Sequence, residues 1–389
     1  MDHREDITRR APAIEEITRL ARTDIVALTP YSSARVEGEQ ARMSAYLDAN
    51  ENPFPPFPAT PATEGLNRYP EPQPHHLLER FSTLYGVAPE SLFFSRGADE
   101  AIDLLVRIFC AAREDAILVT PPAFPMYRSA AHVQGAAVFE VPLLADRGFQ
   151  LDPEGILACH RANANIKLIF VCSPNNPTAN LLRRDHVLSL ARCLWGKAIV
   201  VADQTYVDFS GEHPLSNEIA TYPNLVVLRT LSKEYSLAGE RFGISVACPE
   251  IIGLLRKVMA PYGLTQSTIR AVSAAVTPEG IAYAERHRSA ILDQRNRIAR
   301  ALASSRAVQR VWPSDANFIV VETSQPTMLV EMMASAGIKI RDRSRMPGMG
   351  GCVRISAGLA NENDAMLAVF GDYASKVEAS STVKSAKKQ

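Results

Sequence analysis

Residues 225–236 read LVVLRTLSKEYS. The apolar run Leu225–Leu228 predicts a buried strand, because β-branched and other apolar side chains pack well on a pleated surface. Lys233 therefore follows the carboxyl end of a strand, the edge of an open α/β sheet at which ligands bind. The chain has nine lysines against 33 arginines, so lysine is not generic surface filler here. In a partly apolar cleft Lys233 could lose its proton and attack a carbonyl to form a Schiff base; the alternative is a solvated loop lysine.

Short apolar runs on both sides of this stretch predict further strands, with helical stretches such as Glu100–Ala112 and Arg184–Leu194 between most of them. Strands that alternate with helical crossovers indicate an α/β fold with a seven-stranded, mostly parallel sheet covered by helices on both faces. The last strand could run antiparallel, as mixed sheets allow. The predicted strands are Leu92–Phe94, Ile117–Thr120, Ala137–Val141, Leu168–Cys172, Ile199–Ala202, Leu225–Leu228 and Ile244–Ala247.

A long amphipathic helix from Ile281 to Leu302 predicts a bridge from this large domain, residues 46–278, to a smaller α+β domain, residues 279–376. The small domain is expected to contain helices near 326–336 and 362–375. Its expected strands are Phe318–Val321, Ile338–Ile340 and Val353–Ile355.

The two ends of the chain differ from this core in composition. Residues 1–45 open with an amphipathic helix, and we expect this segment to pack on the small domain or to cover the site as a lid. The proline-rich stretch 46–65 cannot be a central strand or helix, and its aromatic and asparagine residues favour an ordered arm over a flexible linker. The polar tail, residues 377–389, predicts disorder.

Composition excludes several classes of function. The chain has 389 residues, enough for two domains, and its 42 basic residues balance its 42 acidic ones, so no net field attracts nucleic acid or an anionic membrane. Six cysteines without a CxxC pair or metal-ligand spacing indicate buried thiols in a reducing compartment and no metal site. There is no signal-peptide core and no apolar run of the roughly 18 residues that span a bilayer. We therefore expect a cytoplasmic protein.

The first candidate site motif is SRGADEAI, residues 95–102. Gly97 would let the backbone approach a ligand closely, and the free N–H groups of Ala98 and Asp99 would face an anion such as phosphate. An ordinary capped helix, with Ser95 or Asp99 as the N-cap, explains the same residues.

Two more motifs follow other predicted strands. In PPAFPMY, Phe124 lies in a rigid turn and could stack on a flat ring, or it could be a core aromatic. In SPNNPT, Asn176 lies between prolines and could donate to a phenolate oxygen, although a simple turn has the same composition.

The motif VVADQTY places Asp203 directly after four apolar residues. A carboxylate there is costly unless it is paired, and a protonated ring nitrogen would pair it; the alternative is a helix N-cap. Tyr206 could reach the same ring. Arg241, eight residues after Lys233, could bind a phosphate or form a surface ion pair.

In the small domain, Arg341 lies at the end of one short predicted strand and Arg354 lies within another. If they lie together, they could clamp a substrate phosphate or carboxylate, whereas each alone is more often a solvated surface residue.

Taken together, the motifs of the large domain place at five strand ends a residue that is suited to one part of a phosphorylated pyridine aldehyde.

With these residues in place, the sequence resembles the fold-type I pyridoxal-phosphate aminotransferases, and within them the histidinol-phosphate aminotransferase family. The resemblance runs from about residue 28 to residue 358. It rests on the motifs LTPYSSAR, LDANENP, YPEPQP, SRGADEAI, PMY, SPNNPT, RTLSKEYSLAGERFG and VRISAG.

The resemblance implies a role for each matching residue. Lys233 would be the Schiff-base lysine and proton shuttle, Asp203 would pair with the pyridine nitrogen, and Tyr69 would reach the cofactor phosphate from a partner subunit, which implies a homodimer. The other implied cofactor contacts are Tyr206 and Asn176 to the ring oxygen, Phe124 on the ring, and Ala98, Asp99, Thr230, Ser232 and Arg241 at the phosphate. The implied substrate-binding residues are Tyr31, Asn52, Arg341 and Arg354.

The implied reaction converts histidinol phosphate and 2-oxoglutarate to imidazole-acetol phosphate and glutamate, a step of histidine biosynthesis. The chain departs from the family pattern at Gln204, Ala179, Phe124 and Glu240. These departures leave open an aminotransferase for aromatic or other amino acids, or a phosphothreonine decarboxylase that shares the cofactor. A pyridoxal-phosphate-binding regulator would need a DNA-binding domain, for which there is no room before residue 28 and no basic patch.

Overall fold

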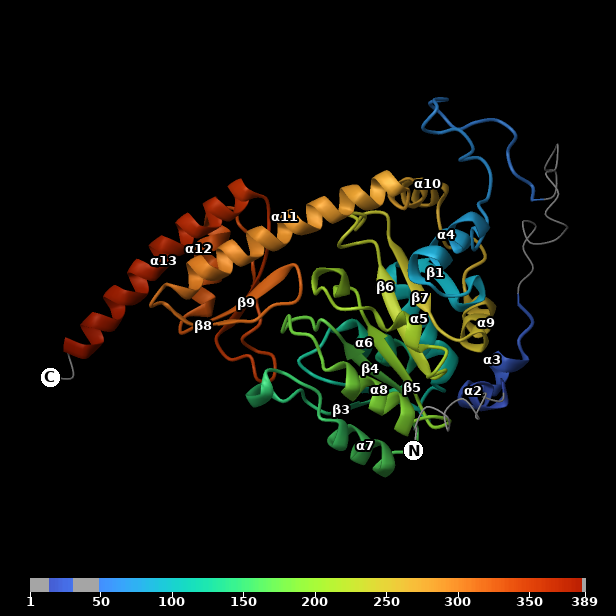
Figure 1. The fold of residues 1–389 in the computed structure, drawn as a ribbon, viewed down its shortest axis with the longest axis horizontal. Helices are drawn as coiled ribbons and strands as arrows, with labels where there is room; N and C mark the ends of the chain where they lie inside the picture. The colour runs from blue at the N-terminus through green and yellow to red at the C-terminus, as the bar shows by residue number, and fades with distance from the viewer. Residues whose placement is uncertain (1–13, 31–48, 387–389) are drawn as a thin grey trace.

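The computed structural model describes residues 14–30 and 49–386, with side chains described up to residue 379. A large domain built on a seven-stranded sheet lies beside a smaller domain, and one long helix joins them (Figure 1). The sheet order is β1-β7-β6-β5-β4-β2-β3, and β7 runs antiparallel to both of its neighbours. Its strands are β1 (Leu92–Arg96), β2 (Ala116–Val119), β3 (Ala137–Glu140), β4 (Ile166–Cys172), β5 (Ile199–Asp203), β6 (Leu225–Thr230) and β7 (Phe242–Val246).

All seven predicted strands are present, and the last is antiparallel as the prediction allowed. Side chains of one strand point alternately to two separate cores: in β4, Ile169 and Val171 enter one core, and Leu168 and Phe170 enter the other. The near-continuous apolar strands are required because helices cover both faces of the sheet.

The helices of the large domain divide between these two faces. One face is covered by α5 (Gly97–Phe109), α6 (Met126–Gln134) and α9 (Pro249–Val258). The opposite face is covered by α4 (His75–Tyr85), α7 (Pro153–Ala162), α8 (Arg184–Cys193) and α10 (Gln266–Ala275). Four short 3-10 helices complete the domain: η1 (Pro89–Ser91), η2 (Ala145–Arg147), η3 (Val207–Phe209) and η4 (Leu215–Glu218).

Helix α11 (Pro278–Ala303) crosses from the large domain to the small one, as predicted (Figure 1). The small domain has a four-stranded antiparallel sheet in the order β10-β11-β9-β8, with helix α13 (Ala360–Ala386) packed against both α11 and α12 (Pro326–Ser335). Its strands are β8 (Val308–Trp312), β9 (Phe318–Thr323), β10 (Arg341–Asp342) and β11 (Cys352–Ser356).

Two strands of the small sheet differ from the prediction. Strand β8 was missed because its middle residues, Gln309 and Arg310, are polar and exposed, as an edge strand permits. The predicted strand Ile338–Ile340 is wrong, since the Ile338 N–H donates to the Met333 carbonyl at the end of α12, and pairing with β11 begins at Arg341.

The opening segment packs on the large domain, which corrects the expectation that it packs on the small one. Helices α2 (Ile14–Leu20) and α3 (Thr23–Ala27) lie against α9, where Ile17 and Leu20 enter the core beneath α5 and α9. The Lys257 ammonium donates to the Val26 carbonyl at 2.5 Å. These helices bury their apolar residues against the apolar surface that α9 offers. The other expectation, a lid, concerns residues 31–45, which lie outside the described residues.

The expectation of a disordered tail after Val377 is also corrected, since α13 continues to Ala386. Pro and Gly are absent from residues 372–386, and alanine and lysine favour helix, so the sequence offers no signal that ends the helix at Val377.

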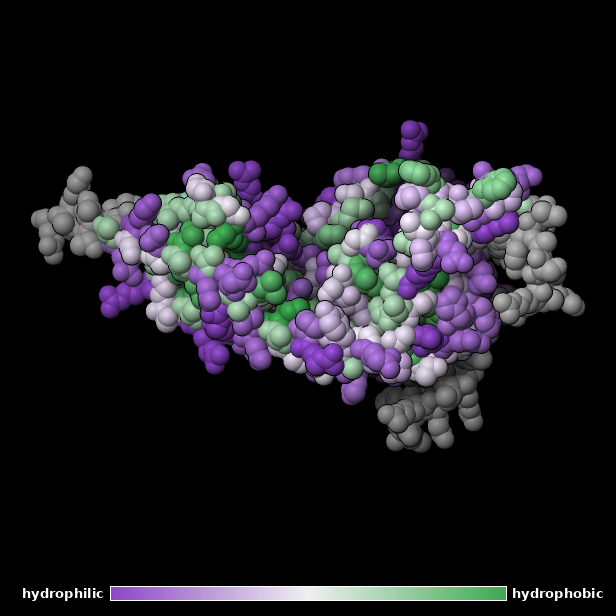
Figure 2. All heavy atoms as spheres, turned by 90° about the horizontal axis from the view of Figure 1, so that it is seen from above, coloured by the Kyte–Doolittle hydropathy of each residue, from purple (hydrophilic) through white to green (hydrophobic). Residues whose placement is uncertain are grey.

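Hydrophilic residues dominate the face seen in Figure 2, and hydrophobic ones gather only in small patches on both domains. None of the helices in the described residues is long and apolar enough to cross a membrane. All six cysteines are free thiols; Cys110, Cys172, Cys248 and Cys352 are buried, and Cys193 is exposed.

Candidate active site

A pocket opens where the loops after β4, β5 and β6 meet the start of α5. Parallel strands deliver their following loops to one edge, so residues far apart in the chain come together there. Ten of the predicted cofactor contacts line this pocket, and Cys172 and Thr205, which the sequence analysis missed, lie with them. The lining residues are Ala98, Asp99, Phe124, Cys172, Asn176, Asp203, Thr205, Tyr206, Thr230, Ser232, Lys233 and Arg241.

Lys233 lies three residues beyond β6 and is partly buried. Its ammonium nitrogen is 5.7 Å from the centre of the Tyr206 ring. Burial lowers the pKa of Lys233, and the nearby positive charges of Arg354 and Arg241 lower it further. The neutral, nucleophilic amine therefore forms more readily here than on an exposed lysine.

Asp203 ends β5 and is only 4% exposed. One carboxylate oxygen accepts hydrogen bonds from the Thr205 hydroxyl (2.6 Å) and the Thr205 N–H (3.1 Å), and the other accepts from the Tyr127 hydroxyl (2.7 Å). Burial raises the pKa of Asp203, and these donors oppose the rise. A cation within reach would stabilise the charged form further.

Tyr127 is a functional candidate that the sequence analysis missed. Its ring stacks on Phe170 at a centroid distance of 4.7 Å, and Phe124 meets its edge at 5.8 Å. The motif PMY contained it, but only the fold shows that a residue at the start of α6 reaches the end of β5.

One corner of the pocket is formed by the start of α5 and by Arg241. An Arg241 Nη atom donates to Asp99 Oδ2 at 2.9 Å. Gly97 has φ +75°, and a Cβ there would overlap the Arg241 guanidinium; a Cβ at Gly243 would overlap the backbone of Gly97 and Ala98. Glycine at both positions therefore lets Arg241 and the helix N-terminus lie together, a combination that binds anions.

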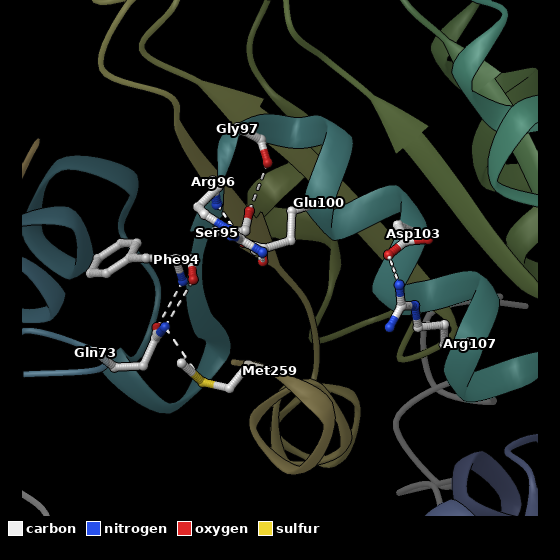
Figure 3. A network of polar contacts seen from close by, with 9 residues as sticks. All are labelled: Gln73, Phe94, Ser95, Arg96, Gly97, Glu100, Asp103, Arg107 and Met259. Carbon is white, nitrogen blue, oxygen red and sulfur yellow. Dashed lines mark hydrogen bonds and ion pairs between the residues drawn. The ribbon is translucent and has the colours of Figure 1, made fainter. Parts of the chain in front are cut away.

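Polar contacts around β1 hold the start of α5 in place (Figure 3). The Ser95 hydroxyl donates to the Gly97 carbonyl at 2.9 Å, and the Arg96 N–H donates to Glu100 Oε2 at 2.6 Å. Further along the strand, the Gln73 amide accepts from the Phe94 N–H (2.7 Å) and donates to its carbonyl (2.8 Å). The backbone N–H groups at the helix start are thus fixed before any ligand arrives.

Thr230 and Ser232 lie beside this corner. The Thr230 hydroxyl accepts from the Ser232 N–H at 3.1 Å, contacts the Ser232 hydroxyl at 2.9 Å, and donates to the Phe242 carbonyl at 2.9 Å. The threonine thus orients the turn that carries Ser232 and Lys233.

The small domain contributes Arg354 from β11. Its guanidinium donates to Asn176 Oδ1 at 2.5 Å and lies 5.1 Å from the centre of the Phe318 ring. Arg341 is directly opposite Arg354 across the β10–β11 pair and is exposed. Arg354 therefore lies at the boundary between the domains, next to the pocket, and Arg341 lies beside it on the neighbouring strand.

Two predicted residues, Tyr69 and Asn52, are not brought into the pocket of this chain. Tyr69 is 49% exposed and stacks on Tyr262 at 4.3 Å. The arm projects from the large domain (Figure 1). Asn52 belongs to the arm, and its side chain accepts from the Phe54 N–H at 3.0 Å. Tyr31 lies outside the described residues.

Two departures from the family pattern have structural consequences. Ala179 is fully buried at φ +68°, a conformation that favours glycine, and its N–H donates to the Asn175 carbonyl at 2.8 Å. Gln204 is buried and its side chain accepts from the Leu215 N–H at 2.8 Å, so it fixes the loop before η4 rather than lining the pocket.

The family model described as "Aminotransferase class I and II" matches residues 44–370. The chain is 39% identical over 359 residues to a histidinol-phosphate aminotransferase of Aeromonas hydrophila, covering 92% of this chain and 99% of the relative. It is 40% identical over 347 residues to one of Cronobacter sakazakii, covering 89% and 94%. The fold is shared with a Sinorhizobium meliloti histidinol-phosphate aminotransferase in complex with pyridoxal-5'-phosphate, with TM-score 0.74, 23% identity, and coverage of 92% and 98%.

Proposed function

Since the chain belongs to the aminotransferase class I and II family, we propose that it uses pyridoxal phosphate to transfer the amino group of histidinol phosphate to 2-oxoglutarate. The observation that carries the proposal is one pocket that combines Lys233, the buried Asp203, and the corner formed by Arg241 and the start of α5. Relatives named histidinol-phosphate aminotransferase, at 39% and 40% identity over most of the chain, support the choice of donor.

The residues present fit the cofactor. Glycine at 97 and 243 leaves the space in which a phosphate can meet the N-terminus of α5 and Arg241. Asp203, buried and acceptor-only when ionised, would pair with a protonated ring nitrogen, and Phe124 would lie against the ring face. Tyr206 and Asn176 would bond the ring oxygen. When bound, the cofactor supplies an electron sink for the carbon next to the transferred amino group.

Lys233 performs the proton transfer. It would hold the cofactor at its aldehyde carbon, and its amine, once free, would take the proton from the carbon next to the amino group and deliver it to the cofactor carbon that receives that group. Its lowered pKa favours the neutral form that accepts the proton. Asp203 would keep the ring nitrogen of the bound cofactor charged, and Tyr127 and Thr205 hold the carboxylate in place for this role.

The substrate anion would be bound at the domain boundary by Arg354 and Arg341, with Tyr31 and Asn52 contributed by the N-terminal part of a chain. Arg354 is held by Asn176, so one asparagine would orient both the cofactor ring and the substrate-binding arginine. Glutamate, the product of the second half of the reaction, would present a carboxylate to the same guanidinium groups.

We further propose a homodimer in which each subunit completes the partner's site. Asp99 and Arg241 remain about half exposed at the phosphate corner, while Tyr69 lies just after the projecting arm and outside the pocket of its own chain. A Glu51–Arg68 ion pair of 2.7 Å and a hydrogen bond from Arg270 to the Ala62 carbonyl (3.2 Å) hold this arm. Mixed dimers of Tyr69→Phe and Lys233→Ala subunits test this: one wild-type site per mixed dimer should restore activity that both parent variants lack.

The six free thiols and the small-molecule substrates support a cytoplasmic location for the enzyme. The reaction needs no nucleic acid or membrane partner.

A direct assay tests the proposal. Purified protein supplied with pyridoxal phosphate, histidinol phosphate and 2-oxoglutarate should form glutamate, and the Lys233→Ala variant should not. Formation of glutamate only from aromatic amino acids would reassign the donor, and release of CO₂ from phosphothreonine without consumption of the keto acid would identify a decarboxylase. Turnover no greater than that of Lys233→Ala with every donor contradicts the proposal.

A further inference from the structure

A third arginine, Arg343, lies on the same face of the small sheet as Arg341 and Arg354. Arg341 is paired directly with Arg354, and residues opposite each other on antiparallel strands point to the same side. The Arg343 N–H donates to the Cys352 carbonyl at 2.9 Å, so the ladder continues for one more residue. Because side chains alternate along a strand, the Arg343 side chain lies on the same face of the sheet as the Arg341 side chain.

This face is the one turned toward the large domain. This face also carries the side chains of Cys352, Phe318 and Val320, which belong to a core shared with the large domain. Their neighbours Val353 and Ile355 point the other way, into the core beneath α11 and α13. The three arginines therefore face the domain boundary, where Arg354 already contacts Asn176.

The three guanidinium groups have no carboxylate partner among the residues that the structure describes. The Nε atoms of Arg343 and Arg354 are buried and donate no hydrogen bond to any of the described residues. The nearest acid in sequence, Asp342, alternates to the opposite face and accepts from the Ser344 N–H (2.7 Å) and hydroxyl (2.6 Å). Burial lowers the pKa of Arg343, and the charges of Arg354 and Arg341 lower it further.

Partly buried positive charges that repel one another are costly unless an anion joins them. One guanidinium fork satisfies a carboxylate, which carries one charge on two oxygens. A phosphate monoester carries close to two charges on three oxygens, so it can accept hydrogen bonds from a second and a third guanidinium group.

We propose that Arg343 is a specificity-determining residue that binds the phosphate of the amino donor beside Arg341 and Arg354, and so distinguishes a phosphate from a carboxylate. The proposal rests on the proposed function, in which one site accepts both histidinol phosphate and glutamate. Arg354 would serve both substrates, and Arg343 would serve mainly the phosphorylated one.

The test compares Arg343→Gln with Arg345→Gln, a control that removes the same charge from an exposed position two residues away. The measured quantity is the ratio of kcat/KM for histidinol phosphate to kcat/KM for histidinol, with the holoenzyme. A lost hydrogen bond to a charged group corresponds to roughly a ten- to hundredfold fall in this ratio. We expect that fall in Arg343→Gln, with KM for glutamate changed by less than about threefold, and an unchanged ratio in Arg345→Gln.

Thermal unfolding of the holoenzyme gives a readout besides turnover. Inorganic phosphate should raise the Tm of wild type and of Arg345→Gln and should raise that of Arg343→Gln less. Without phosphate, Arg343→Gln should unfold at the wild-type temperature or higher, because like charges are removed; a lower Tm would instead indicate a structural role and overturn the proposal.

The remaining outcomes are also decisive. An unchanged phosphate preference in Arg343→Gln, or an equal loss in Arg345→Gln, overturns the proposal while the proposed function stands. Wild type that does not act on histidinol phosphate overturns the proposed function, and the phosphate-dependent Tm then still reports whether Arg343 binds the anion. If Arg343→Gln does not fold, Arg343→Lys replaces it, and this variant should keep the charge but lose part of the preference.

Discussion

The Tyr127 hydroxyl donates a hydrogen bond of 2.7 Å to Asp203 Oδ2 and so joins the start of α6 to the end of β5. Both residues are almost fully buried, and the bond opposes the rise in the pKa of Asp203 that burial causes. The Tyr127 hydrogen bond thus favours the charged form of the carboxylate that we propose pairs with the cofactor nitrogen.

Replacing Tyr127 with Phe should raise the pKa of Asp203, because one of its hydrogen-bond donors is lost. We expect kcat at neutral pH to fall by about tenfold and the free energy of unfolding to fall by about 1–3 kcal/mol, the range for a lost bond to a buried charged group. Urea unfolding and steady-state kinetics measure the two effects. The same change at exposed Tyr283 is the control, and equal effects of both substitutions would contradict this role.

Gly97→Ala should weaken cofactor binding, because the added Cβ displaces the Arg241 guanidinium. Gly337, at φ +77° with open space around its Cα, controls for the backbone strain that any side chain brings at positive φ. Both variants should lose about 1 kcal/mol of stability. Only Gly97→Ala should raise the dissociation constant for pyridoxal phosphate, measured by absorbance titration, by about tenfold or more. An equal affinity in both variants would show that the corner tolerates the methyl group.

The reactivity of Lys233 toward aldehydes should depend on pH with a midpoint below the ordinary lysine value of 10.5. Burial and the charges of Arg354 and Arg241 favour the neutral amine, so the rate of pyridoxal phosphate capture by cofactor-free protein should rise at a lower pH than for a free lysine. Arg354→Gln removes one of these charges and should shift the midpoint upward. A midpoint that stays in place in this variant would contradict the electrostatic account.

Glu234, the neighbour of Lys233, should make the stability of the protein depend on pH. Burial raises its pKa from 4.5 to about 7, with a further contribution from Asp208, while Arg288 of α11 opposes the rise through an ion pair of 2.6 Å. The folded state therefore binds this proton more tightly than the unfolded state does. The contribution of Glu234 to the free energy of unfolding is greatest below about pH 4.5. It declines as the pH rises to about 7 and is constant above that pH.

Urea unfolding at pH 5 and pH 8 measures this contribution. Glu234→Gln should lose less stability than wild type between the two pH values, and the exposed Glu285→Gln should lose as much as wild type. A pH dependence of Glu234→Gln equal to that of wild type would show that Glu234 does not titrate in this range.

The large sheet and its pocket could be predicted because most strands are continuous apolar runs and several site residues lie at or shortly after the end of one. Lys233 and Asp203 lie at neighbouring strand ends, so the parallel topology alone brings them together. The polar strand β8 and the extension of α13 were missed because an edge strand and a helix end lack such a signal.

The remaining site residues depend on tertiary contacts. Tyr127 reaches Asp203 only because α6 starts beside the end of β5, and Arg343 faces the domain boundary only because β10 pairs with β11 in one register. Tyr69 lies outside the pocket of its own chain, so its predicted role depends on a second subunit.

The measurement that tests the central claim most directly is the absorbance spectrum of the purified protein with pyridoxal phosphate. The account predicts a visible band that is lost in Lys233→Ala, changes to the amine form when histidinol phosphate is added, and returns when 2-oxoglutarate follows. If another donor alone produces this cycle, the chemistry at Lys233 stands and the assigned substrate is wrong. If pyridoxal phosphate gives no band that depends on Lys233, the account of this pocket is contradicted.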